Sequence, residues 1–107
     1  MVKQYEIYWV SLDPTRGSEI KKTRPCLIIS PDEANKHLNT VLIAPITSTV
    51  RRFPMRMYLV LKKKKGQIAL DQIRCIDKLR LSDKIAALDK TEIKKLRLLL
   101  KEFLIDD

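Results

Sequence analysis

The fold is decided by three short apolar stretches, Tyr5–Leu12 (YEIYWVSL), Arg24–Ser30 (RPCLIIS) and Val41–Thr47 (VLIAPIT). Each stretch is rich in aromatic or β-branched residues, a composition typical of β-strands. Asp13-Pro14 ends the first stretch, and the polar segment from Asp13 to Thr23 predicts a loop before the second. The third stretch shows no polar alternation, which indicates a strand that is buried on both faces.

Further strands follow these three. Met55–Leu61 predicts a fourth strand, and the lysine run after it, ending in Gly66, predicts its turn. Gln67–Asp77 predicts one long strand or two short strands around a bend, and Ile85–Leu88 predicts a last short strand.

Two helix starts are visible. Ser30-Pro31-Asp32-Glu33 has the pattern of a capping box with proline at the first helical position, which predicts a short helix to about Leu38. Asp89 and Glu92 give a second cap. Apolar residues then fall on one helical stripe: Ile93, Leu96, Leu100, Phe103 and Leu104. The sequence therefore predicts a mainly β fold, a small curled antiparallel sheet or barrel with a C-terminal helix, and the 107 residues fit one domain over 1–107.

Charge is the dominant global feature. The chain has 22 Lys and Arg against 13 Asp and Glu, a net charge of +9. No acidic residue occurs from Ala34 to Leu70, and the basic residues of that stretch are Lys36, Arg51, Arg52, Arg56 and Lys62–Lys65. A surface of one sign attracts polyanions. A nucleic acid or an acidic protein is therefore the expected partner.

Hydropathy and cysteine usage predict the compartment. No apolar run approaches the ~18 residues that span a bilayer, and the first residues contain no apolar stretch of the kind that forms a secretory signal. We therefore expect a cytoplasmic protein with no membrane partner. Cys26 and Cys75 both have apolar neighbours, and in a reducing compartment we interpret them as small buried hydrophobes, neither a disulfide nor a metal pair.

Few catalytic chemistries fit these residues. The single histidine, His37, excludes a two-histidine acid–base pair, and its polar neighbours favour a surface position. There is no Cys/His cluster at metal spacing, no tight carboxylate cluster and no glycine-rich phosphate loop. We therefore expect no metal and no cofactor. The candidates for catalysis are polar residues at strand ends or interrupting apolar stretches: Arg24, Thr47, Ser48, Asp71, Gln72 and Arg74.

Four sequence blocks resemble one family. Tyr8–Glu19 (YWVSLDPTRGSE), Thr23–Pro25 and Pro45–Ser48 resemble the first half of MazF/PemK-type toxins, and Asp71–Lys78 (DQIRCIDK) resembles a later segment of the same family. The blocks follow in family order over essentially the whole chain, and the first is the most specific. The resemblance implies a homodimeric SH3-like barrel and a cognate antitoxin partner. It also implies an endoribonuclease that cuts single-stranded RNA at short sequences, leaving 2′,3′-cyclic phosphate and 5′-hydroxyl ends, and so inhibits translation and growth.

The resemblance also implies roles for single residues. Arg24 would stabilise the charge of the phosphorane with its planar fork, and Thr47 would fix the in-line geometry. Glu19 is the candidate for the base or for orienting the substrate. The expected substrate contacts are Ser18, Ser48, Asp71, Gln72 and Arg74.

The proton acceptor is left open by the resemblance. Asp71 matches an aspartate with a base role in some plasmid-borne relatives, but those relatives carry an arginine two residues earlier, where this chain has Ala69.

Two other interpretations stay open. A CcdB-like toxin that poisons DNA gyrase without nuclease activity would share the barrel but lack the Arg-Pro and Thr-Ser pairs, and Ile105–Asp107 offers no obvious apolar C-terminus for that role. A non-catalytic RNA-binding SH3-like module would explain the net charge but not the strand-end positions of Arg24 and Thr47.

Overall fold

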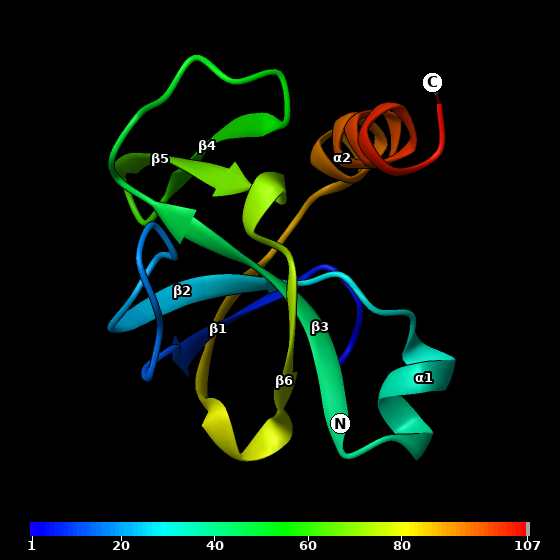
Figure 1. Cartoon of the computed structure of the whole chain (residues 1–107). Helices are drawn as coiled ribbons and strands as arrows, with labels where there is room; N and C mark the ends of the chain where they lie inside the picture. The colour runs from blue at the N-terminus through cyan, green and yellow to red at the C-terminus, as the bar shows by residue number, and fades with distance from the viewer. Residues whose placement is uncertain (107) are drawn as a thin grey trace.

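The computed structural model describes residues 1–106, which form seven strands, two α-helices and two short 3-10 helices. In chain order these are β1 (Glu6–Ser11), β2 (Thr23–Ile28), α1 (Asp32–His37), β3 (Thr40–Thr47), β4 (Arg56–Leu61), β5 (Lys64–Ala69), η1 (Leu70–Gln72), β6 (Arg74–Asp77), η2 (Lys78–Arg80), β7 (Leu81–Ala87) and α2 (Lys90–Leu104). The sheet runs β4-β5-β3-β2-β1-β7, and β6 pairs with β3 off this path. Every pairing is antiparallel. Figure 1 shows the strongly curled sheet with α2 beside β4 and β5, so the predicted mainly β fold with a C-terminal helix is confirmed.

Strand β3 holds the sheet together. Its first half pairs with β6, its end pairs with β5, and β2 lies along its other edge. Neighbouring side chains of a strand point to opposite faces, so Ile43 packs in one apolar cluster while Ala44 and Ile46 pack in another. The prediction that this strand is buried on both faces is confirmed.

The core therefore consists of two clusters, one on each face of the central strands. The cluster nearer α2 contains Ile7, Leu27, Ile29, Ala44, Ile46, Met57, Leu59, Ile68, Leu70, Leu88 and Leu96. The second cluster contains Val10, Leu12, Cys26, Ile28, Val41, Ile43 and Ile76. Leu96 is the only fully buried residue of α2, which shows that this helix packs by a narrow stripe.

The turn between β4 and β5 differs from its prediction. The chain reverses at Lys62 and Lys63, whose φ angles are 49° and 67°, and not at Gly66. A two-residue hairpin turn of this hand needs positive φ at both central positions, which glycine or asparagine normally supplies. Gly66 instead lies buried within β5, where a Cβ atom would stand 3.1 Å from the carbonyl oxygen of Thr47. This glycine allows β5 to approach β3 closely.

The two predicted caps have different outcomes. At α1 the capping box is wrong, because the N-cap residue is Pro31 and no side chain bonds the helix end. The Ser30 hydroxyl instead donates to Asn35 Oδ1 at 2.5 Å and accepts from Leu42 N at 3.0 Å. The hydroxyl therefore joins α1 to β3 and does not cap the helix. At α2 the capping box between Asp89 and Glu92 is confirmed, with reciprocal bonds of 2.8 and 3.0 Å.

Other predictions are sharpened or corrected. Residues 67–77 form two strands around a bend, as one alternative predicted, with η1 as the bend. Strand β7 begins at Leu81 and is longer than predicted, because its register follows β1. Cys26 is fully buried, but Cys75 is exposed on β6, so its predicted burial is wrong. His37 is exposed, as predicted, and lies beside Glu33.

The helices of the described chain are short. None in residues 1–106 is both long and apolar enough to cross a membrane.

Candidate active site

Arg24 and Thr47 come together because their strands are antiparallel neighbours. The β2–β3 register pairs Cys26 with Pro45. Because the strands run in opposite directions, continuing this register two residues back along β2 and two residues forward along β3 brings Arg24 beside Thr47. The two strand ends predicted as catalytic are thus adjacent in the fold.

Two hollows meet at these two residues. The larger, of about 650 Å³, is lined by Ser18, Glu19, Ile20, Lys21, Arg24, Thr47, Thr49, Arg51, Phe53, Arg56, Asp71 and Gln72. The second, of about 450 Å³, is lined by Trp9, Thr23, Arg24, Pro25, Ile46, Thr47, Ser48, Leu61, Lys62, Lys64, Lys65, Gly66 and Ile85. Arg24 and Thr47 belong to both walls. We call the larger hollow the loop groove and the second the lysine groove.

Thr47 is held rigidly. Its side chain is buried, and its hydroxyl oxygen accepts a hydrogen bond from Thr49 N at 3.1 Å. Within residues 1–106 the hydroxyl donates no hydrogen bond, and because a hydroxyl both donates and accepts, its proton is available for a ligand. Its cross-strand partner Gln67 is fully buried and bonds both backbone groups of Arg51 at 2.9 Å. Gln67 thereby anchors the segment after Thr47.

The side chain of Arg24 lines both grooves. Its Nε donates to Lys21 O at 3.2 Å, and within residues 1–106 the two terminal nitrogens make no hydrogen bond. A guanidinium with two free nitrogens can bond two oxygens of one phosphate. Arg24 is therefore poised for an anion.

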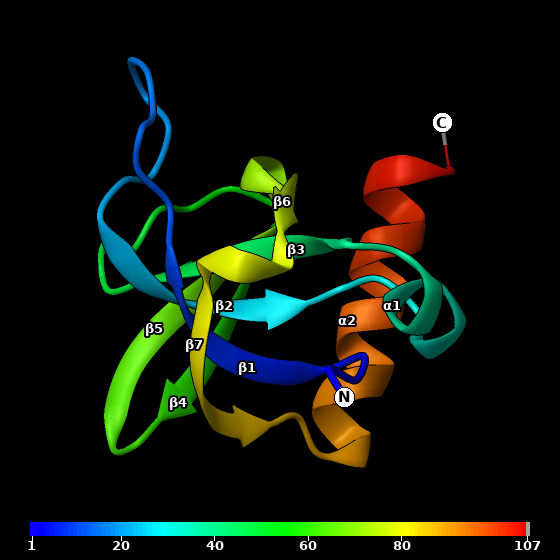
Figure 2. The same ribbon diagram turned by 90° about the horizontal axis from the view of Figure 1, so that it is seen from below.

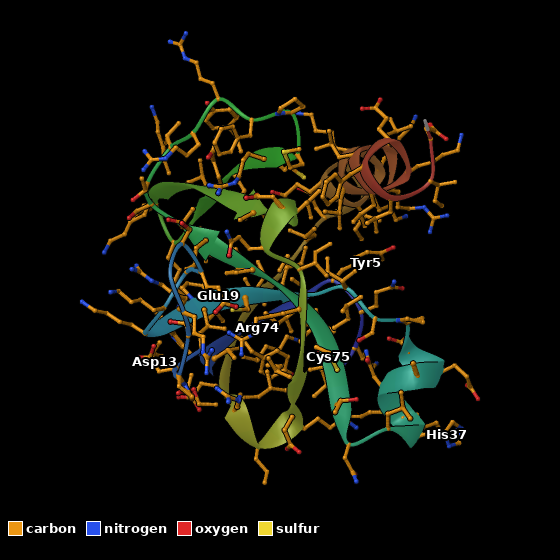
Figure 3. All side chains as sticks on the ribbon, in the orientation of Figure 1. Tyr5, Asp13, Glu19, His37, Arg74 and Cys75 are labelled. Atoms are coloured by element: carbon orange, nitrogen blue, oxygen red, sulfur yellow. The ribbon has the colours of Figure 1, made fainter. Side chains whose placement is uncertain are left out.

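Ser18 and Glu19 lie on the exposed loop between β1 and β2, and both line the loop groove. Glu19 Oε1 accepts from Arg16 N at 2.5 Å, and Glu19 N donates to Arg16 O at 3.1 Å. This small turn within the loop orients the carboxylate. Figure 3 shows Asp13, Glu19 and Arg74 on the same side of the molecule, with His37 far from them.

Asp71 lines the loop groove but is already paired. Arg56 Nε and Nη2 donate to its two oxygens at 2.6 and 3.0 Å, and the Arg56 guanidinium lies 5.4 Å from the centre of the Phe53 ring. Burial alone would raise the pKa of Asp71, but the hydrogen bonds and charge of Arg56 outweigh burial and hold that pKa below its ordinary value. A carboxylate held in this state is a poor proton acceptor and a good fixed charge.

The sequence marked Arg56 only as one of the basic residues of the stretch without acidic residues, and its pairing with Asp71 was not predicted. Arg56 is the cross-strand partner of Ala69, so its guanidinium reaches Asp71 from β4. No sequence signal pairs a β4 residue with Asp71 before the register is known. Arg51 was likewise marked only for its charge, and Thr49, Phe53 and Lys21 of the loop groove were missed.

The remaining predicted substrate contacts, Gln72, Ser48 and Arg74, lie in different parts of the structure. Gln72 lines the loop groove and accepts from Ile20 N at 3.3 Å. Ser48 is exposed in the lysine groove. Arg74 lines neither groove, and its guanidinium donates to Leu12 O at 3.1 Å. Over residues 1–106, no group of three or more His, Cys, Asp or Glu residues could hold a metal ion.

Fold and site define a small curled-sheet protein with a basic double groove, and comparisons with known proteins agree on its class. Residues 3–104 match the family model described as PemK-like, MazF-like toxin of type II toxin-antitoxin system. Endoribonuclease MazF of Staphylococcus epidermidis is 33% identical over 99 residues, covering 87% of this chain and 82% of that protein.

Solved structures share the fold. MazF (Form-I) from Deinococcus radiodurans has a TM-score of 0.83 at 24% identity, with 96% of each chain covered. An endoribonuclease in complex with its cognate antitoxin from a mycobacterial species has a TM-score of 0.82 at 21% identity, covering 97% of this chain and 95% of that one. This chain belongs to the PemK-like, MazF-like toxins of type II toxin–antitoxin systems.

Proposed function

We propose that this chain cuts single-stranded RNA at a short sequence, without a metal, by attack of a ribose 2′-hydroxyl on the adjacent phosphorus. Its family membership and the likeness to Endoribonuclease MazF make it a MazF-like endoribonuclease toxin. The observation that supports this chemistry best is the pair Arg24 and Thr47 on the wall shared by two basic grooves.

The reaction forms one bond and breaks one. The 2′-oxygen bonds to phosphorus as its proton leaves, and the bond from phosphorus to the 5′-oxygen of the next nucleotide breaks. The products are a 2′,3′-cyclic phosphate and a 5′-hydroxyl, whose proton comes from water. The crowded intermediate carries extra negative charge, which Arg24 stabilises through its two free nitrogens. Thr47 donates its hydroxyl to a phosphate oxygen and aligns the attack.

Glu19 is the better proton acceptor of the two candidates. Both oxygens of Asp71 are bonded by Arg56 and its pKa is lowered, so it accepts a proton poorly. Glu19 has one oxygen bonded to a backbone N–H and the other free within residues 1–106. Asp71, Gln72, Ser18 and Ser48 then contact RNA on either side of the cut, and Arg74 has a different role, argued below.

The first experiment is cleavage of a long unstructured RNA in EDTA, with product ends identified by mass. Wild type should cut and leave cyclic phosphates, and Arg24→Ala and Thr47→Ala should each lose about 10²-fold or more, as expected for removal of one preorganised donor. The matched controls are Arg97→Ala and Thr91→Ala, which change exposed residues of α2 that line neither groove. No cutting by folded wild type, or full activity in Arg24→Ala, would contradict the proposal, and inhibition of DNA gyrase would be tested next.

The base assignment is tested by comparing two isosteric variants. Glu19→Gln should lose most of the single-turnover rate and the acidic limb of the pH profile, because the proton acceptor is gone. Asp71→Asn should keep that limb. The opposite pattern would assign the base to Asp71.

The proposed partners are a cognate antitoxin and a second copy of this chain, with the cytoplasm as the compartment. A similar protein has been solved in complex with its antitoxin, and an acidic segment would complement the basic walls of both grooves. Exposed apolar side chains on β4 and α2 favour self-association: Tyr58, Val60, Leu98, Phe103 and Leu104.

Each partner has its own test. Co-expression with the neighbouring reading frame should give a complex that no longer cuts RNA, and absence of any complex would reject that partner. Light scattering should give a dimer mass for wild type and for Leu79→Glu, a control at an exposed site on η2. Phe103→Glu should shift the mass toward the monomer. A monomeric wild type would contradict the dimer.

A further inference from the structure

The loop between β1 and β2 carries two residues of the loop groove, Ser18 and Glu19. It runs from Leu12 to Lys22, and Ser18 and Glu19 are exposed. In Figure 2 this loop stands out from the sheet, away from α2. The turn within the loop orients the Glu19 carboxylate, but its position relative to Arg24 and Thr47 depends on what holds the loop to the rest of the fold.

Two arginines hold the beginning of the loop. Arg80 Nη1 donates to Ser11 O at 3.1 Å and to Asp13 O at 2.6 Å. Arg74 Nη1 donates to the carbonyl oxygen between them, Leu12 O, at 3.1 Å. Three consecutive carbonyls, at the point where the chain leaves β1, are thus bonded by guanidinium groups from more than 60 residues away in the sequence.

The end of the loop is held from the same segment. Gln72 Oε1 accepts from Ile20 N at 3.3 Å, directly after Glu19. The neck is closed by the bond from Leu12 N to Lys22 O at 3.1 Å. Gln72, Arg74 and Arg80 lie within nine residues of one another, on η1, β6 and η2. This segment contacts the loop backbone at both ends, while Ser18 and Glu19 between them line the loop groove.

The segment is itself rigidly attached to the fold. Strand β6 pairs with β3, the strand that ends in Thr47, through Ile43↔Arg74 and Val41↔Ile76. Lys78 N donates to Asn39 O at 2.9 Å, and Lys78 Nζ bonds the buried Asn35 carbonyl. The positions of Thr47 and of the loop are therefore both fixed relative to β3.

We propose that Arg80 and Arg74 are positioning residues that set the height of the loop over the groove, and so place Glu19 for proton transfer. This inference rests on the proposed nuclease function. A charged donor bonded to a carbonyl is stronger than a neutral one, and misplacement of a catalytic group by about 1 Å can lower a rate about 10²-fold. The two arginines act through the backbone and need not touch RNA.

The test uses Arg80→Ala, Arg80→Lys and the control Arg97→Ala in the full chain. Arg80 is half-buried at the surface, so thermal unfolding should change little in any of these variants. Amide exchange at residues 14–21 should become faster in Arg80→Ala, and Arg80→Lys should restore part of the protection, because an ammonium can also donate to two carbonyls. This measurement needs no RNA.

Kinetics complete the test. Arg80→Ala should lower the single-turnover rate about tenfold or more with little change in KM, and it should have no further effect in a Glu19→Ala background, because the residue it positions is gone. Amide exchange at residues 14–21 that is unchanged in Arg80→Ala would overturn the proposal. It would also be overturned if Arg80→Ala lowered the rate equally in the wild-type and Glu19→Ala backgrounds. If wild type does not cut RNA at all, the proposed function fails, and the exchange data alone decide whether the two arginines hold the loop.

Discussion

Replacing Arg56 by methionine tests how much the ion pair beneath the loop groove stabilises the fold. The Arg56 side chain is 7% exposed and the Asp71 side chain is 22% exposed, and two hydrogen bonds of 2.6 and 3.0 Å join them. An exposed pair contributes about 0.2–1 kcal/mol, while removing one partner of a fully buried pair costs about 3–5 kcal/mol. The observed burial lies between these limits, which gives a loss of about 2–3 kcal/mol for Arg56→Met.

The same pair predicts a pH dependence. The pKa of Asp71 is lower in the folded chain than its ordinary value of 3.8, because Arg56 stabilises the carboxylate against the opposing effect of burial. A lowered folded-state pKa stabilises the fold fully above the unfolded pKa, and the stabilisation is lost as pH falls through the folded value. The stability difference between wild type and Asp71→Asn should therefore be constant from pH 7 to about 5 and shrink below pH 4.

Urea unfolding followed by circular dichroism at a series of pH values measures both effects. A loss of 2–3 kcal/mol corresponds to a fall in Tm on the order of 10 °C for a domain of this size. The double variant Arg56→Met/Asp71→Asn should lose less than the sum of the single losses, because no unpaired charge remains. A loss of unfolding free energy below about 0.5 kcal/mol in Arg56→Met would refute this reasoning. So would a stability difference between wild type and Asp71→Asn that does not change with pH.

Three further predictions concern single positions. Gly66→Ala should lower RNA cleavage about tenfold while changing stability by no more than about 1 kcal/mol, because the new Cβ would press on Thr47 O at 3.1 Å; an unchanged single-turnover rate would contradict this. Cys75 should react rapidly with a thiol reagent at pH 8 and Cys26 only on unfolding, because burial raises the pKa of Cys26 to about 12; two fast thiols would contradict this. Asp89→Ala should cost about 1 kcal/mol in urea unfolding, since it removes a capping box, and no change would show that α2 is held by packing alone.

Local patterns in the sequence predicted much of the fold. The cap at Asp89 was predictable because both of its partners lie within one helical turn. The hairpin turn was not, because Lys62 and Lys63 are poor residues for positive φ, and Gly66, the usual signal for a turn, is needed for a contact with β3 instead. Ser30 was misassigned for a similar reason, since its hydroxyl serves α1 and β3 rather than a helix end.

The candidate site was predictable in part. Arg24 and Thr47 could be named as strand-end residues, and the β2–β3 register brings them together. The contact of Arg56 with Asp71 could not be predicted, because it depends on the pairing of β4 with β5. The single hydrogen bond of Arg74 to a backbone carbonyl 62 residues earlier could not be predicted either, because an arginine in an apolar stretch was interpreted as a substrate contact.

The pairing of β3 along both of its edges has a consequence for how long each part of the site stays intact. Backbone groups in the centre of a sheet are generally protected until the sheet itself opens, whereas a surface loop can open locally at a lower free energy. Thr47 ends the doubly paired strand, and Glu19 sits on the loop. The Thr47 half of the site is therefore expected to open only with the sheet, while the Glu19 half depends on the hydrogen bonds from Gln72, Arg74 and Arg80 that hold its loop.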